Sequence, residues 1–293
     1  MKKILSILLS ALAFTGCYET VLYNTNHPNE AAVAFEVSLP VTLDGDLTLV
    51  FGGDAYTCAA GEIFELPKLY LPGEYTYYIY NEPTSESVSY DTSVPSVIAT
   101  VATTRSVIES MPDYIYFGMG TVTLEKDTEI VLTPTMNPVI RDLNIELELE
   151  GDAKDDLESV TVSLSGVLQQ WECISDLPYG TSAEVAPELT ITTTTEAVSG
   201  SDETTTTYLL EGAVRLLGIM PSETQTLSVE LNYVGGNPVS HTFTSDVTDL
   251  LSTFNDDKST PMTLSNSVET PTESNPSGSI DDWTTENKDL NAQ

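Results

Sequence analysis

The chain has 293 residues, with 45 Asp and Glu against 10 Lys and Arg, so its formal net charge is −35 at pH 7. A surface this acidic repels phosphate backbones and anionic lipid headgroups, which argues against nucleic acid as a partner. Hydrophobic residues make up 40% of the chain, enough for packed cores, and the length is that of two domains.

The N-terminus has the order of a secretory signal peptide. Two lysines precede an apolar run from Ile4 to Phe14, and small residues lead up to Cys17. The run is about half of the ~20 residues that a membrane-spanning helix needs, so we interpret it as a removable signal. A Cys directly after Thr15-Gly16 resembles a bacterial lipobox, which implies that Cys17 is lipidated and becomes the first mature residue. An ordinary signal peptide followed by a chance Cys is the alternative.

Residues 17–30 are polar and contain a turn-forming Asn-His-Pro-Asn run, so we expect a lipidated tether. Alternation of apolar and polar residues then predicts strands. In the first unit we expect them over 33–39, 47–51, 75–80, 97–102, 114–124 and 128–132. The last two are predicted to pair around Glu125-Lys126-Asp127. Residues 82–90 are predicted as a loop, and residues 106–111 have slight helical character.

The clearest alternation opens the second unit, where Leu143, Ile145, Leu147 and Leu149 share one face and three glutamates lie on the other. Further strands are expected over 160–164, 189–198, 204–217, 227–233, 239–244 and 260–268, with one short helix over 246–254. Threonine runs at 192–195 and 204–207 are typical of an exposed β-ribbon, because Thr is β-branched yet tolerates water.

Short strands, turn clusters and very little helix predict an all-β protein made of two β-sandwich domains. We place a signal peptide at 1–16, the tether at 17–30, an N-terminal sandwich at 31–138, a C-terminal sandwich at 139–270 and a polar tail at 271–293.

The sequence offers no catalytic centre, so we predict that the chain is not an enzyme, and we predict no cofactor and no metal site. The two histidines, His27 and His241, are interpreted as solvated or structural. Acidic runs at 152–156 and 256–257 lack the spacing of a calcium loop, although a weak calcium site stays open. Gly118-Met119-Gly120 is interpreted as a bulge or a close strand contact, because no helix follows it.

Besides Cys17 the chain has Cys58 and Cys173. An oxidising compartment would allow them to pair, but they lie in different predicted domains, so we expect two separate buried thiols.

Only Trp171 and Trp283 are available as tryptophan platforms for a glycan.

The order of several features resembles the fimbrial lipoproteins of Bacteroidetes-type (type V) pili, especially the fimbrillin-associated anchor subunits. They are the lipobox at Cys17, His27-Pro28, Leu71-Pro72-Gly73-Glu74-Tyr75, the stretch from Pro138 to Gly151 with Arg141, Val160 to Val167, and Ile280-Asp281-Asp282-Trp283. The resemblance covers most of the mature chain and implies two transthyretin-like Greek-key β-sandwich domains in tandem.

The resemblance also implies other fimbrial subunits as partners and the exposed side of the outer membrane as the location. Subunits of that family polymerise by β-strand addition, after a protease acting at Arg or Lys removes the first strand. This chain has no Lys or Arg between Cys17 and Lys68. We therefore expect the first strand to stay attached and the subunit to anchor or terminate a fibre. The alternative is a glycan-binding outer-membrane lipoprotein beside a transporter.

Overall fold

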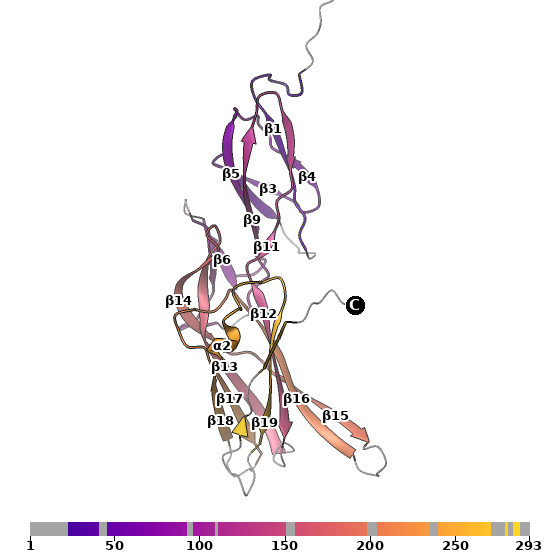
Figure 1. Ribbon diagram of the computed structural model, residues 1–293, viewed down its shortest axis with the longest axis vertical. Helices are drawn as coiled ribbons and strands as arrows, with labels where there is room; N and C mark the ends of the chain where they lie inside the picture. The colour runs from indigo at the N-terminus through magenta and orange to yellow at the C-terminus, as the bar shows by residue number, and fades with distance from the viewer. Residues whose placement is uncertain are drawn as a thin grey trace, which may run out of the picture.

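The computed structural model describes residues 23–40, 46–92, 96–108, 111–150, 156–197, 204–234, 240–270, 279–280 and 284–287. The molecule is long, with a β-rich part at the N-terminal end and a larger β-rich part below it (Figure 1). Strands dominate, and the described residues contain one short helix, α2 (Thr248–Leu251). The all-β, sandwich-type fold predicted from the sequence is confirmed.

The N-terminal part contains two sheets. The smaller has the order β10-β1-β4, and the larger has the order β11-β9-β5-β2-β3. Their bounds are β1 (Ala32–Glu36), β2 (Leu47–Phe51), β3 (Asp54–Cys58), β4 (Ile63–Glu65), β5 (Gly73–Asn81), β9 (Tyr116–Leu124), β10 (Glu129–Leu132) and β11 (Asn137–Pro138). Side chains from both sheets form one hydrophobic cluster, which includes Phe35 of β1 and Phe51 of β2.

The C-terminal part is built from two longer sheets. One has the order β15-β16-β12-β19, with β20 and β21 on the outer side of β19, and the other has the order β18-β17-β13-β14-β8, with β7 on β13 and β6 on β7. Their bounds are β6 (Val88–Asp91), β7 (Ile98–Val101), β8 (Val107–Ile108), β12 (Arg141–Glu150), β13 (Leu157–Glu172), β14 (Leu177–Val185), β15 (Thr190–Ala197), β16 (Thr204–Leu216), β17 (Thr226–Tyr233), β18 (Ser240–Asp246), β19 (Met262–Glu269), β20 (Ser279–Ile280) and β21 (Thr284–Asn287).

The two hydrophobic clusters do not divide at residue 138. Strands β6, β7 and β8 precede that residue, yet they pair within the sheet of β13 and β14, and Val88, Ala99 and Ile108 are buried in the larger cluster. Limits of 31–138 and 139–270 remain a proposal for the two domains. The strand pairing assigns residues 88–108 to the second part.

Strands with strong alternation lie where the sequence predicts them. The four apolar residues of β12 from Leu143 to Leu149 are all buried, while Glu148 and Glu150 are exposed. Strands β15 and β16 form the predicted ribbon, in register from Thr190 opposite Glu211 to Ala197 opposite Thr204. The alternation therefore reports one buried face, as expected for a sandwich.

Three local predictions were wrong. The expected loop at 82–90 ends in β6, which begins at Val88, and the stretch with helical character contains β8. Strands β9 and β10 do not pair: β9 lies between β5 and β11, whereas β10 lies parallel to β1 in the other sheet. Asp127 between them has a positive φ of 57°, and the chain crosses from one sheet to the other at this turn.

The glycine run in β9 is a close strand contact, as one of the two interpretations predicted. A Cβ on Gly118 would lie 2.6 Å from the carbonyl oxygen of Thr135, and one on Gly120 would lie 2.5 Å from the Tyr77 hydroxyl. The pairing of β9 with β5 runs from Gly73 opposite Leu124 to Tyr80 opposite Phe117 without a bulge. A side chain at either position would collide with its neighbours, which explains the glycines there.

Candidate strand-addition site

The first strand lies in the middle of its sheet. Strand β1 pairs parallel with β10, from Ala32 opposite Glu129 to Phe35 opposite Leu132, and antiparallel with β4 through Ala34 opposite Glu65. An N-terminal strand with a partner on each side leaves a vacant, two-sided slot in the sheet when it is removed. Such a slot suits a strand donated by another chain, since main-chain hydrogen bonds would hold it on both edges.

The inner face of β1 fills the N-terminal core. Ala31, Val33, Phe35 and Val37 are buried. The Phe35 ring contacts the rings of Phe51 and Tyr77 edge to face, at centroid distances of 5.8 Å and 5.1 Å. Alternate residues thus insert side chains into the core, which fixes the register of any strand in this slot, because a one-residue slip would turn them outward.

The described part of the predicted tether, which leads into β1, is hydrogen-bonded to the folded chain. We call residues 23–30 the leading segment. The Asp127 carboxylate accepts hydrogen bonds from the backbone N–H of Asn24 (2.8 Å) and of Thr25 (3.0 Å), and the Asn24 amide donates to the Asp127 carbonyl (2.9 Å). The Asp127 N–H donates to the Glu30 carbonyl at 2.9 Å. We call this set of contacts the Asp127 clamp.

Lys68, the first basic residue after Cys17, follows β4. Its ammonium donates to the Asp54 carboxylate and lies 5.1 Å from the centroid of the Tyr70 ring. This ion pair lowers the pKa of Asp54. Burial and the hydrogen bond with Tyr56 raise the pKa of Tyr70. A cut at Lys68 would fall after β4, so it would detach more than the first strand.

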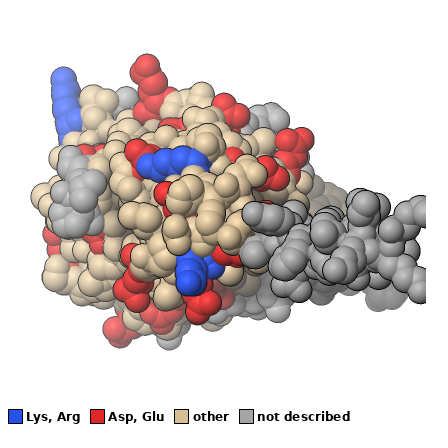
Figure 2. Space-filling view, turned by 90° about the horizontal axis from the view of Figure 1, so that it is seen from above, with Lys and Arg blue, Asp and Glu red and all other residues tan. Residues whose placement is uncertain are grey.

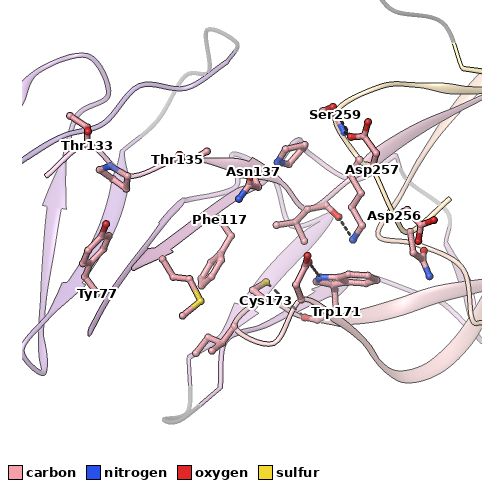
Figure 3. A pocket seen from close by; sticks show the side chains of 18 residues that line it. Tyr77, Phe117, Thr133, Thr135, Asn137, Trp171, Cys173, Asp256, Asp257 and Ser259 are labelled. Atoms are coloured by element: carbon pink, nitrogen blue, oxygen red, sulfur yellow. Dashed lines mark hydrogen bonds between the residues drawn. The ribbon is translucent and has the colours of Figure 1, made fainter. Parts of the chain in front are cut away.

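A hollow with a volume of about 660 Å³ lies between the two parts (Figure 3). Residues of β9, of the linking strand β11 and of the loop after α2 line it, and its polar side chains include Asn137, Asp256 and Asp257. Trp171 lies at one side, with its indole N–H donating to Asp176 at 3.0 Å.

Lys258 lines this hollow and is unusual because its ammonium group is buried. Its ammonium nitrogen lies 3.0 Å from the centroid of the Trp171 ring and donates to the Val139 carbonyl at 3.0 Å. Burial lowers the pKa of Lys258 to about 7, although the nearby Asp176 carboxylate acts in the opposite direction. The lysine thus connects the loop after α2 to the chain between β11 and β12.

Cys17, the predicted lipidation site, lies outside the described residues. Cys58 and Cys173 are separate, buried and unpaired, as predicted, and burial raises their thiol pKa values to about 11 and about 12. His27 is exposed, with its Nδ1 atom 3.6 Å from a Glu30 carboxylate oxygen, and the His241 ring packs on Phe243.

The surface is acidic. Seen from the N-terminal end, carboxylates are spread over the molecule and basic side chains are few and separated (Figure 2). Among the described residues, no group of three or more His, Cys, Asp or Glu is placed to hold a metal ion. None of the described helices is long and apolar enough to cross a bilayer.

Comparison with known proteins gives the class of the fold. No protein-family model matches the chain, and no curated protein sequence matches it significantly. Among solved structures, a candidate adhesin from Bacteroides thetaiotaomicron is similar with a TM-score of 0.56 at 12% identity, covering 90% of this chain and 99% of that chain. The chain therefore shares its all-β fold with this candidate adhesin over nearly the whole length of both.

A fimbrial protein is among the similar structures. The fimbrial anchor protein Mfa2 from Porphyromonas gingivalis has a TM-score of 0.54 at 8% identity, covering 87% of this chain and 97% of that chain. A candidate polysaccharide-binding protein from Bacteroides thetaiotaomicron has a TM-score of 0.50 at 10% identity, with coverages of 90% and 99%. At these identities the likeness concerns the fold, and it confirms the resemblance to fimbrial-type proteins at that level.

Proposed function

We propose that this chain is a structural cell-surface lipoprotein, a fimbrial anchor or minor subunit joined to other subunits by β-strand addition. Lipid on Cys17 holds it in the outer membrane, on the exposed side, and it performs no catalysis. The observation that carries the proposal is the position of β1 between β10 and β4: while β1 stays there, it fills the slot in which another subunit's strand would bind, as expected for a subunit that ends a fibre. The fold shared with Mfa2 supports it.

The role of an anchor rests on retention of β1. Three contacts oppose its loss: pairing on both edges, burial of Phe35 and its neighbours, and the Asp127 clamp. Burying the side chains of Val33, Phe35 and Val37 stabilises the strand by roughly 5–8 kcal/mol. The absence of Lys and Arg from residue 18 to residue 67 removes the sites at which a basic-specific protease would cut. A strand that stays in place keeps the lipid attached to the folded chain.

The test is a crosslinking pull-down of the lipidated protein from intact cells, with partners identified by mass spectrometry. We expect all-β secreted subunits in a ladder of complexes, and Cys17→Ala should shed fibres into the medium. The N-terminus of the chain in assembled fibres should be Cys17. A mature chain that starts after β1 would rule out the anchor role, and a pull-down without other subunits would rule out the fimbrial one.

A glycan-binding lipoprotein beside a transporter is the second candidate, supported by the similar polysaccharide-binding structure. Trp171 is 2% exposed, so it offers no platform for a sugar, while Tyr114 and Tyr179 are exposed. Recovery of a transporter barrel in the same pull-down, without a pilin-like subunit, would favour this function. A glycan array with the purified chain would then identify the ligand.

A further inference from the structure

Strand β15 ends its sheet. In the described part of the chain its only neighbour is β16, so the other edge of β15 has no strand beside it. At eight residues it is longer than β18, the outer strand of the seven-stranded sheet, which has seven. An unpaired row of backbone N–H and C=O groups is a template for a further strand.

Both faces of β15 are also uncovered. The residues from Thr190 to Thr195 are all exposed, including Ile191 at 39%. Strand β16 pairs with β12 only as far as Tyr208 opposite Leu149, so the pairs beyond it belong to a two-stranded ribbon. Figure 1 shows this ribbon projecting away from the body of the C-terminal part. An isolated two-stranded ribbon is marginally stable in water and gains from a third strand.

Most features that usually block an outer strand are missing from β15, in which Glu196 is the one charged residue. Its sequence, Thr-Ile-Thr-Thr-Thr-Thr-Glu-Ala, has no Lys, Pro or Gly, and its pairing with β16 has no bulge. Natural outer strands are protected by such features. The geometry and the composition of β15 therefore both allow another strand to pair with its outer edge.

The charge pattern indicates the partner. The chain carries a net charge of −35, yet residues 189–195 and 204–210 contain no charged side chain. The ribbon is thus a place where a second strongly acidic molecule meets little local repulsion. Antiparallel pairing that sets Thr190 opposite Ala197 places Glu196, the one charged residue of β15, opposite Ile191 of the other copy.

We propose that β15 is a docking edge for β15 of a second copy of this chain, which adds antiparallel about a two-fold axis. The threonines of the two strands then form cross-strand pairs, which stabilise antiparallel sheets. Eight residues at about 3.3 Å each make an overlap about 26 Å long, with the two bodies at its opposite ends. This length exceeds the Debye length of ~8 Å at physiological salt, so repulsion between the bodies is screened.

The test measures association of the mature chain, made without lipid as Cys17→Ser, by sedimentation velocity over about a hundredfold range of concentration. Salt of about 0.05 M and about 0.5 M is compared, because screening reduces the repulsion between two acidic molecules that meet through a ribbon with few charges. We expect a reversible dimer that tightens at the higher salt. Thr193→Lys should weaken it at least about tenfold, since a charged lysine protects an outer strand.

The matched control is Thr244→Lys, the same change at an exposed position of β18, the other long outer strand. It should leave the dimer unchanged, and circular dichroism should report the same fold for both variants. A monomer at every concentration and salt would overturn the proposal. So would a dimer that weakens with salt, or one that the two lysine variants affect equally.

Discussion

Replacing Lys258 by Met should stabilise the C-terminal part near pH 7 and remove a rise in stability with pH. The ammonium is buried against Trp171, and this burial lowers its pKa from 10.5 to about 7 in the folded chain. Keeping a proton on this buried amine costs folding free energy, whereas the unfolded chain keeps the proton at no such cost. Met is similar in length and needs no proton.

The sign and size follow from proton linkage. Between pH 7 and pH 10.5 the unfolded chain binds more protons at Lys258 than the folded chain, so the free energy of unfolding rises with pH. The slope approaches about 1.4 kcal/mol per pH unit, which gives roughly 2 kcal/mol between pH 7 and pH 9. Below pH 7 both states are protonated and this group adds no slope.

The assay is urea unfolding of the wild type and of Lys258→Met at pH 7, 8 and 9, followed by circular dichroism. The raised thiol pKa of Cys58 lowers stability only as pH rises through the ordinary thiol range, and it affects both proteins equally. Burial raises the pKa of Cys173 and the Lys258 ammonium acts in the opposite direction, so both proteins carry Cys173→Ala in this comparison. The difference between the proteins therefore isolates the lysine. Lys258→Arg, which stays charged, should also lose the slope but be less stable. If Lys258→Met kept the full slope, the reasoning would be refuted.

Three further results are expected. Phe35→Ala should destabilise the N-terminal part by about 4 kcal/mol, because a buried ring with two aromatic contacts is lost, and hydrogen exchange should rise there while Glu36→Ala stays near wild type. Asp127→Ala should lower the free energy of unfolding by about 1–2 kcal/mol and speed amide hydrogen exchange in the leading segment, and Asp127→Asn should have a smaller effect on both. Unchanged hydrogen exchange in Asp127→Ala would contradict the clamp. Cys58 and Cys173 should resist iodoacetamide until urea unfolds the chain, and rapid labelling of the native protein would show that they are accessible.

Local alternation explains which strands the sequence predicts. Strands β12 and β17 alternate between a buried face and a less buried one, so period two identifies them directly. Strand β4 has three residues and β8 has two, too few to show a period. Strand β14 contains Pro178 and Gly180, which predict a turn, but the long strand β13 beside it holds it in place.

Pairing partners and buried charges are harder to predict, because they depend on contacts distant in sequence. The hairpin expected at Glu125-Lys126-Asp127 fails since β10 pairs with β1 instead of β9. The Asp127 clamp joins residues 103 positions apart, and an Asp in a Lys-Asp turn carries no signal of that contact. Likewise, nothing in the residues around Lys258 indicates that its amine is buried beneath Trp171.

The parallel pairing of β1 with β10 has a consequence for folding. Ala32 pairs opposite Glu129, so this part of the sheet can form only when the chain brings together residues almost a hundred positions apart. Contacts of such high sequence separation form slowly. As the chain is made, β1 therefore precedes its partner β10 and stays unpaired on that edge until residues 129–132 are available. Until then Val33 and Phe35 are exposed, and the newly made chain needs protection from aggregation for that interval.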